Sequence, residues 1–360
     1  MKNLIVLLIL FIWTRGILRS QDFHFSQYNE NPALVNPALT GATSALRASL
    51  VYKDQWRSIT NPYSTFGFSF ESKFKPSNWD VVDPRRSMTF KKSYSRLAGG
   101  LAVYNDKAGS GKMGTFQTSL SLAMFFPLTK MSSLSFGLQS SIVQRKVDNT
   151  KFVYPDQYNG IGYDPNLVSG ETYSQQRVFY PDFGAGLLWT YAHNEKSIAA
   201  NNQFKAQIGI SSFHLFEPVQ SFLKSSGDHL YRKYVFHGNF LIGLPNTMVG
   251  LAPSWLVQVQ GPSKEILAGL MIKYYLNDDS KYTGIIKRSS IGIGAYYRNA
   301  DSFIAAVLYE FGRYSIGFSY DINTSDLTKV STARGGPELT IKFVTPNPFL
   351  YQKRAKAMFN

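Results

Sequence analysis

The sequence contains no cysteine in 360 residues. This absence excludes disulfides, thiol catalysis and zinc–thiolate centres. Charged residues are also scarce, at 17% of the chain. After residue 20 there is no apolar run long enough to cross a bilayer as a helix. If the chain crosses a membrane, it must therefore do so with alternating strands that close into a barrel.

The first twenty residues have the layout of a secretory signal peptide. Lys2 precedes an apolar core at residues 4–13, and that core is too short to span a bilayer as a helix. We predict a signal peptide at residues 1–20 with cleavage before Gln21, although Leu18, Arg19 and Ser20 form a poor small-x-small site. Without cysteine there is no lipobox. Export to the cell envelope is the context that this leader predicts.

Acidic residues are few, with 23 against 38 lysines and arginines and a formal net charge of +15. An excess of this kind suits anionic partners. The basic residues are mostly scattered and the chain carries a secretory leader, so nucleic acid is not an expected partner. Lipopolysaccharide phosphates, an acidic protein partner and a merely solvated excess of charge remain as alternatives.

What the chain has in quantity is aromatic residues, at 15%, and glycine, at 28 residues, arranged with period two. In residues 133–142, for example, one face carries Leu134, Phe136, Leu138 and Ile142, and the other carries Ser133, Ser135, Gly137, Gln139 and Ser141. The pattern predicts about fourteen strands. Their centres lie near Val51, Phe68, Leu101, Leu120, Leu138, Leu187, Ile208, Phe240, Val257, Leu270, Ile293, Val307, Phe318 and Ile341. We predict an all-β protein, a transmembrane antiparallel barrel, over a soluble sandwich or propeller, because the inner faces are small and rich in Gly and Ser.

The connections between these strands predict the orientation of the barrel. Turns on the periplasmic side of such barrels are short and outer loops are long. Short connections fall at residues 127–131, 244–248 and 312–313, whereas 146–179, 215–230 and 323–335 are long. We therefore place the first set in the periplasm and the second outside. The long basic stretch at 71–95 breaks the rule, either because a strand is miscounted or because it is a periplasmic interaction surface.

The stretch after the leader shows no strand period, and its two Asn-Pro pairs argue against a helix. It also carries too many apolar side chains for a solvated tail, so we expect it to dock in the barrel or at its rim. Its pattern resembles the mature N-terminus of the PorP/SprF family, outer-membrane components of the type IX secretion system of Bacteroidetes, as do Gln55 and Trp56 at the end of the first strand. The residues that match the opening motif are Gln21, Asp22, Phe25, Ser26, Gln27, Tyr28, Asn31, Pro32, Asn36, Pro37, Ala38 and Gly41.

The resemblance extends along the mature chain, for instance to the Gly-x-x-Val-x-Asn-Asp-Lys element at residues 100–107. It implies a non-enzymatic secretion component, without cofactors, that works with other type IX components and engages the C-terminal region of an exported protein or gliding adhesin. It also implies a segment at residues 21–45 that plugs or lines the rim of a barrel at 46–344, followed by a periplasmic tail at 345–360. A general porin or uptake channel is the alternative.

Catalytic candidates are few. Ser212 and His214 are spaced to share a face, as are His237 and Asn239, which leaves an outer-membrane lipase as a hypothesis. A serine-rich barrel offers such pairs by accident, so we expect no enzyme. His24, His193 and His229 show no ligand spacing, so we expect no metal site.

Overall fold

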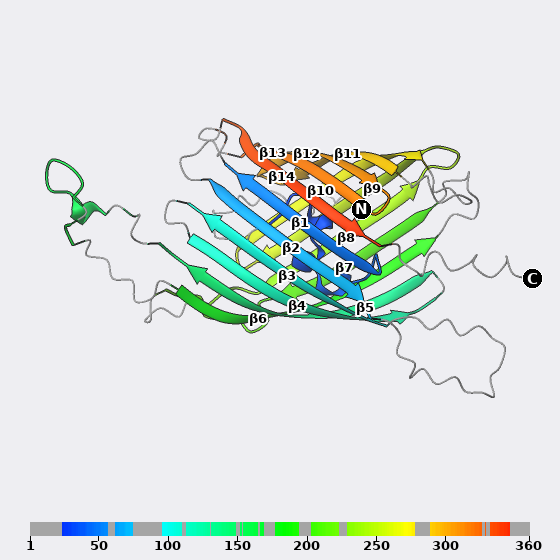
Figure 1. Ribbon diagram of the computed structural model, residues 1–360, viewed down its shortest axis with the longest axis horizontal. Coiled ribbons are helices and arrows are strands. Elements are labelled where there is room, and N and C mark those ends of the chain that lie inside the picture. Colours follow the sequence, from blue (N-terminus) through cyan, green and yellow to red (C-terminus); the bar gives the residue numbers. More distant parts are fainter. Residues whose placement is uncertain are drawn as a thin grey trace, which may run out of the picture.

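The computed structural model describes residues 24–56, 62–74, 96–109, 113–129, 131–148, 152, 154–164, 166–168, 177–193, 203–222, 229–277, 289–325, 328 and 332–345. These residues form a closed barrel of fourteen antiparallel strands (Figure 1). Each strand pairs with the next one in the chain, and β14 closes the ring on β1 through a register that runs from Arg47 opposite Val344 to Lys53 opposite Glu338. Closure leaves no sheet edge unpaired.

The strands are β1 Leu46–Gln55, β2 Tyr63–Lys73, β3 Leu97–Ala108, β4 Met113–Pro127, β5 Ser132–Lys146, β6 Arg177–His193, β7 Phe204–Phe213, β8 Lys233–Gly243, β9 Val249–Gln260, β10 Ser263–Asn277, β11 Ser289–Arg298, β12 Ser302–Phe311, β13 Tyr314–Asn323 and β14 Arg334–Val344. Each of the fourteen predicted centres lies within one of them. The prediction of an antiparallel barrel is confirmed, and so is the strand count.

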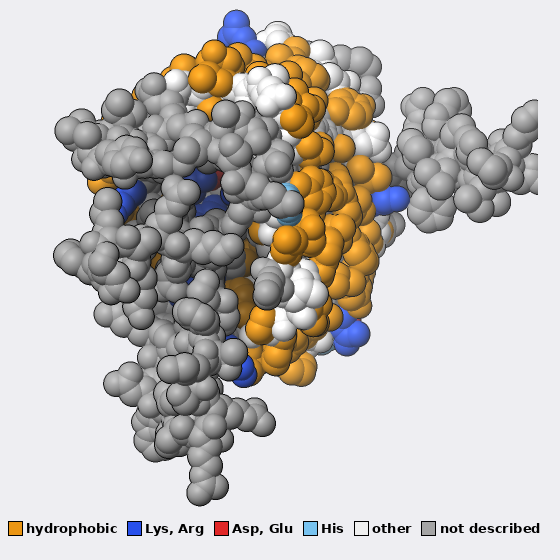
Figure 2. All heavy atoms as spheres, turned by 90° about the vertical axis from the view of Figure 1, so that its right-hand side faces the viewer, with side chains coloured by type: hydrophobic (Ala, Val, Ile, Leu, Met, Phe, Trp, Pro, Cys, Tyr) orange, Lys and Arg blue, Asp and Glu red, His pale blue; other side chains and the backbone are white. Residues whose placement is uncertain are grey.

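The alternation in the sequence becomes an outer and an inner face. On β5, Leu138 and Ile142 are 52% and 66% exposed, whereas Ser135 and Gln139 are buried. Similar apolar side chains gather over the flank of the barrel in Figure 2. A face of this kind is stable where lipid, rather than water, surrounds it.

The connections at the two ends of the barrel differ less than predicted. At the end where β1 begins, 128–131, 244–248 and 312–313 are short, as expected, but 194–203 and 278–288 are longer than the rule predicts. At the opposite end, 147–176 and 214–232 are long, but 109–112, 261–262 and 299–301 are also short, so the expectation of long loops there is wrong at these three places. Each contains a residue with positive φ, namely Gly109, Gly261 or Ala300, which permits a tight turn.

The basic stretch predicted at 71–95 is shorter than expected. Glu71 and Lys73 belong to β2, which pairs with β3 from Ser64 opposite Lys107 to Lys73 opposite Ala98. Because β2 and β3 are neighbours in the ring, no strand is missing between them. Residues 75–95 lie outside the described part of the chain.

The described helices are short: η1 Tyr28–Glu30, α2 Pro32–Val35, η2 Pro37–Leu39 and η5 Pro155–Gln157. The first three lie inside the barrel (Figure 1), and η5 lies in the connection between β5 and β6. In the part of the chain that the structure describes, no helix is both long and apolar enough to cross a membrane.

Candidate functional site

Residues 24–45, here called the lumen segment, run through the interior of the barrel. The prediction that this part of the chain docks in the barrel is confirmed, but the prediction that it contains no helix is wrong. Each Asn-Pro pair starts a short helix, α2 after Asn31 and η2 after Asn36. Proline at the first helical position lacks only an N–H that would be unpaired there anyway, and its fixed φ suits a helix. The Asn36 side chain completes the second start, because it accepts from Ala38 N–H at 2.8 Å.

The wall of β5 to β7 is shaped to receive this segment. A Cβ added at Gly137 would collide with the backbone of Pro37 and Ala38, and one added at Gly186 would collide with the Asn36 side chain. A third, at Gly209, would lie 2.7 Å from Asn36 Nδ2. These inward glycines therefore let the segment lie directly against the backbone of the wall, which no other residue type permits at these positions.

Asn36 is fully buried and lies at the centre of this contact between the segment and the wall. Its Nδ2 donates to the Leu187 carbonyl at 3.0 Å and lies 3.1 Å from His237 Nε2. Two wall serines bind the backbone nearby: Ser211 Oγ donates to the Val35 carbonyl at 2.5 Å and Ser135 Oγ to the Ala38 carbonyl at 3.0 Å. The carbonyls of a segment that is neither sheet nor long helix are thus satisfied by the wall.

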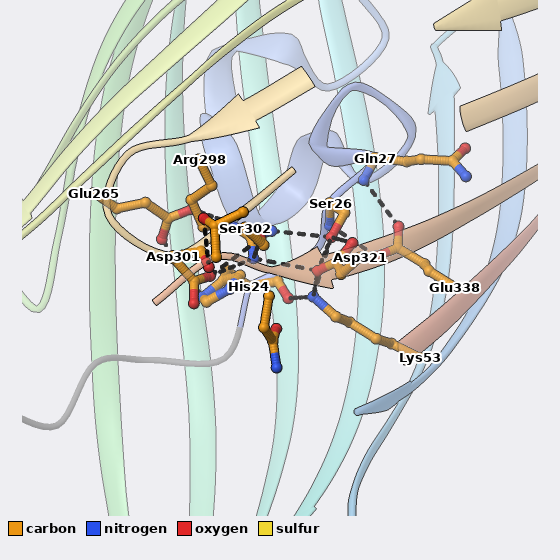
Figure 3. Close-up of polar contacts among 12 residues, drawn as sticks. His24, Ser26, Gln27, Lys53, Glu265, Arg298, Asp301, Ser302, Asp321 and Glu338 are labelled. Carbon is orange, nitrogen blue, oxygen red and sulfur yellow. Dashed lines mark hydrogen bonds and ion pairs between the residues drawn. The ribbon is translucent and has the colours of Figure 1, made fainter. Parts of the chain in front are cut away.

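The first residues of the lumen segment meet a buried group of charges from five strands and one turn (Figure 3). Ser26 Oγ donates to Asp321 at 2.6 Å and accepts from Arg298 Nη2 at 2.9 Å and Lys53 Nζ at 3.2 Å. The backbone N–H groups of Ser26 and Gln27 donate to the two oxygens of Glu338, at 2.7 and 2.9 Å. One serine and two amides therefore occupy the centre of an otherwise charged cluster.

Arg298 joins the strands of that cluster. Its guanidinium contacts Asp301 at 2.9 Å, Asp321 at 3.2 Å and Glu265 at 3.3 Å, and its side chain is 2% exposed. Lys53 contacts Asp321 at 3.4 Å. A cation so deeply buried is tolerable only when several carboxylates and hydrogen bonds surround it.

A second charged group holds the segment near the start of β1. Glu30 lies 2.6 Å from Lys342 Nζ, and Arg47 Nη2 donates to the Glu30 carbonyl at 2.7 Å. Arg47 also lies 3.6 Å from Glu71, and a Glu71 oxygen accepts from Gly41 N–H at 2.5 Å. The lumen segment is therefore bound through charges near both ends of the barrel.

His24 and Glu30 of the lumen segment have shifted pKa values. Burial lowers the pKa of His24 to about 4, although the Glu265 carboxylate 3.5 Å away opposes the shift. Burial would raise the pKa of Glu30, but the charges of Lys342 and Arg47 outweigh it and hold this pKa below the usual glutamate value. At neutral pH the docked segment thus carries a neutral imidazole and an ionised carboxylate.

Apolar contacts fill the space between the charged groups. Phe25 packs with Val51, Ala102 and Tyr104, its ring centroid 6.1 Å from that of Tyr104. The wall here therefore carries larger side chains than the Gly- and Ser-rich inner face that the sequence predicts. A second cluster combines the segment with inward side chains of β6 to β12: Tyr28, Val35, Ala38, Leu39, Leu188, Phe213, Val235, Leu256, Leu267, Met271, Tyr296, Ile304, Ala306 and Leu308.

Two small cavities lie beside the segment. One cavity between the segment and β1, β7 and β8 has a volume of about 30 Å³, and another next to Leu34 and His214 about 20 Å³. Each has room for a water molecule or two. At these two places the segment is therefore packed closely against the wall.

The structure separates the predicted motif residues into three sets. Gln21 and Asp22 lie outside the described residues. Gln55 and Trp56 end β1, where Trp56 N–H donates to the Gly335 carbonyl at 2.6 Å and its ring meets Tyr63 edge-on at 4.9 Å. The set that the barrel brings together consists of Phe25, Ser26, Gln27, Tyr28, Asn31, Pro32, Asn36, Pro37, Ala38 and Gly41.

Sequence reasoning missed the wall residues that bind this set. Lys53, Asp321 and Glu338 each stand at an inward position of an alternating strand. A charge at such a position is the signal that could have found them, because a buried charge needs a partner. The sequence pattern does not show that three strands bring these charges to one serine.

The described residues give no support to the hypothesis of a catalytic serine, histidine and acid. His214 Nδ1 lies 3.0 Å from Asp182, but Ser212 Oγ has no hydrogen-bond partner in the described structure. His237 contacts Asn36. Among the described residues, no group of three or more His, Asp and Glu side chains could hold a metal ion. A histidine paired with an acid but not with a nucleophile does not make a relay.

The fold and the lumen define a membrane β-barrel that is filled by its own N-terminal segment. The chain belongs to the PorP/SprF family: residues 17–343 match the family described as type IX secretion system membrane protein PorP/SprF. A comparison with curated proteins gives no significant match. The protein is therefore a PorP/SprF family membrane barrel of type IX secretion.

Solved structures with a similar fold include BamA from Haemophilus ducreyi lacking POTRA domains 1–3, at 11% identity over 84% of this chain and 70% of that one, with a TM-score of 0.40. CdiB from Escherichia coli has 10% identity over 83% and 63%, with a TM-score of 0.38. The beta domain of the Bordetella autotransporter BrkA has 8% identity over 84% and 100%, with a TM-score of 0.37. At these identities the similarity concerns the fold alone.

Proposed function

We propose that this protein is a non-enzymatic outer-membrane component of type IX secretion that engages an exported partner, the C-terminal region of a secreted protein or gliding adhesin, for export or surface attachment. Family membership supports a role in secretion. The observation that carries the proposal is the lumen segment, because it is bound to charged wall residues near both ends of the barrel. A barrel filled in this way is a rigid platform whose accessible surfaces are its loops and rims.

The proposed arrangement in the cell follows from the ends of the chain. Residues 1–20 are a signal peptide that is cleaved before Gln21, and residues 345–360 are a periplasmic tail. Strand β1 starts and β14 finishes at the same end of the barrel. With that end in the periplasm, the long connections 147–176 and 214–232 face outward. These connections are the proposed surface for the exported partner, and the periplasmic rim meets other type IX components.

Surface proteolysis of intact cells tests this orientation. The turn at Tyr158 and Tyr163 is exposed in the connection between β5 and β6, so a protease that cleaves after aromatic residues should cut there. Residues 128–131 at the opposite end should be spared. Cleavage that requires prior permeabilisation of the outer membrane would contradict the orientation.

A general porin is the alternative, and the lumen weighs against it. A porin needs an open polar passage, whereas here the cavities beside the segment have room for little more than water. Asn36 is buried and the inward glycines leave room for the segment, so the wall is complementary in shape to it. A loosely held tail in an open channel would need neither feature.

The proposal is tested by deleting residues 23–39 while Gln21, Asp22 and the signal peptide are kept. We expect an inserted barrel that no longer supports partner export. A matched control is Ile341→Leu on the outward face of β14, outside both the lumen segment and the proposed partner surface. Copurification from outer membranes followed by mass spectrometry should recover type IX components and an exported partner with the intact protein. Unimpaired export by the deletion variant would remove the secretion role assigned to the segment.

A further inference from the structure

A row of cations crosses the outward wall of β3 to β6 at the end with the long connections. Lys107 stands opposite Gly114, Gly114 opposite Lys146, and Lys146 opposite Arg177, so three cations occupy one continuous register line. All three are exposed. The glycine gives the Lys146 side chain room, because a Cβ there would lie 2.9 Å from Lys146 Cε.

These cations face away from the lumen. Lys146 shares a face of β5 with exposed Ile142 and Leu138, and Arg177 shares a face of β6 with Phe179. Asp106, next to Lys107, points inward instead and accepts from Thr65 Oγ1 at 2.6 Å. The row therefore lies on the lipid side, at the end of the apolar band.

The described part of the chain supplies no ion-pair partner for the row. Among the described residues, the ion pairs of the barrel involve none of Lys107, Lys146 and Arg177. Lys146 and Arg177 are direct cross-strand neighbours, whose Cβ atoms in such a pair are about 5 Å apart. Like charges placed directly opposite repel one another, so this pair is most stable with an anion between them.

The next outward registers complete a layered surface. Toward the barrel centre, the following line contains two amides and two rings, in the order Asn105, Phe116, Gln144 and Phe179. Beyond that line come Val103, Thr118, Ile142 and Pro181, and then Leu101, Leu120, Ser140 and Phe183. Cations, then amides with aromatic rings, then mostly apolar side chains follow one another toward the bilayer centre.

We propose that this wall binds a phosphorylated glycolipid of the outer leaflet, the lipid A part of lipopolysaccharide. Its phosphates would lie on the three cations, its sugar hydroxyls and amides on Asn105 and Gln144, and its acyl chains along the apolar lines. The row spans three inter-strand spacings, about 14 Å, which suits a disaccharide that carries a phosphate at each end. The site rests on the orientation proposed above and is independent of any exported partner.

The remainder of the same rim has a different composition. Tyr52, Tyr234 and Tyr297 point outward there on β1, β8 and β11, as in an aromatic girdle. Lys264 on β10 is a single exposed cation on a distant part of the ring. It provides a control, because it is an outward cation near the start of its strand but lies outside the row.

The experiment measures lipid binding to the purified full chain by native mass spectrometry in detergent. We expect bisphosphorylated lipid A to bind the intact protein and the Lys264→Gln variant alike. The triple variant Lys107→Gln, Lys146→Gln and Arg177→Gln should bind it about tenfold more weakly or worse. Lipid A without phosphates should bind the intact and triple variants equally.

Two further measurements distinguish lipid A binding from general phospholipid binding and from misfolding. Phosphatidylglycerol is offered to the intact protein, and binding as tight as that of lipid A would assign the row to ordinary phospholipid and overturn the proposal. The single charge reversal Lys146→Glu is used beside the triple variant in case the latter fails to fold, as judged by heat-modifiable migration. Equal lipid A binding by the intact protein and by any folded variant of the row would also overturn it.

Discussion

The two faces of the barrel wall differ in how much each position depends on its partner. On β13, Ile316 and Phe318 point outward and need only be apolar, because lipid accommodates many shapes. On the inner face of the same strand, Asp321 binds Ser26, Lys53 and Arg298 at once. The outer face is therefore repetitive and replaceable, whereas the inner face is specific to one segment of the same chain.

This contrast determines where substitutions are costly. An outward apolar residue loses little when exchanged for another apolar one. An inward charge, by contrast, is stable only because its partners surround it, and removal of one partner leaves the others buried and unbalanced. The lumen segment is thus a structural part of the wall that it contacts, and the following changes probe the inner and outer faces separately.

Arg298→Ala should have the largest effect of the point changes. Asp321, Glu265 and Asp301 lose their common cation, and Ser26 loses a donor. We expect the free energy of unfolding in lipid vesicles to fall by about 3–5 kcal/mol, as for other broken buried pairs. The outward neighbour Tyr297→Phe is the control and should change it little. An Arg298→Ala barrel as stable as the intact one would contradict the charged contact described above.

Ile341→Lys tests the outer face. Ile341 is exposed and stands between Leu50 of β1 and Ile316 of β13, both apolar and outward. A charge there enters the lipid band, and we expect a cost of about 2–4 kcal/mol. The yield of heat-modifiable barrel measures it, with Ile341→Leu as the conservative control. Normal yield from the lysine variant would mean that this face does not contact lipid.

Asn36→Ala tests the contact between the lumen segment and β5 to β7. The variant loses the hydrogen bonds to Leu187 and Ile210 and the contact to His237, and it leaves Ala38 N–H without its cap. We expect docking of the lumen segment to weaken by about 1–3 kcal/mol, seen as more frequent open events in a planar bilayer. Asn166→Ala in an outer loop should leave the record unchanged. No difference between the two variants would argue that Asn36 only fills space.

Acidification should have the smallest effect. The docked segment holds His24 with its pKa lowered to about 4, whereas free histidine titrates near 6.5, so protonation favours release as the pH falls from about 6.5. Glu30 acts in the same direction at lower pH, because its lowered pKa stabilises docking only while it is ionised. Open events should increase between about pH 7 and about pH 4, and His24→Asn should remove the upper part of that rise. A rise of the same size and midpoint in that variant would exclude His24.

Much of the fold was predictable because a lipid-exposed strand leaves a period-two pattern. Ile316 and Phe318 alternate with Ser315, Gly317 and Ser319, and the structure places the two sets on opposite faces. On β12 this signal is weaker, because Ile304 and Leu308 are apolar yet face the lumen segment. Local pattern cannot reveal an inner face that is apolar for a reason lying elsewhere in the chain.

The site was predictable only in part. The composition of the N-terminal stretch predicted docking, but Asn-Pro was interpreted as a barrier to helix when it starts one at Pro32 and again at Pro37. The convergence of Lys53, Arg298 and Glu338 on Ser26 and Gln27 depends on the register of strands far apart in sequence. Alternation fixes the face of each charge, but not its height or its partner.

The most direct test of the account is the conductance of the barrel without residues 23–39 in a planar bilayer. The intact protein should conduct little, because the segment crosses the lumen and is bound to charged wall residues near both ends of the barrel. The deletion variant should insert as a barrel and conduct ions clearly more. Equal conductance of the two proteins, with the variant folded, would show that the lumen segment does not close the barrel. A general porin would then be the better interpretation.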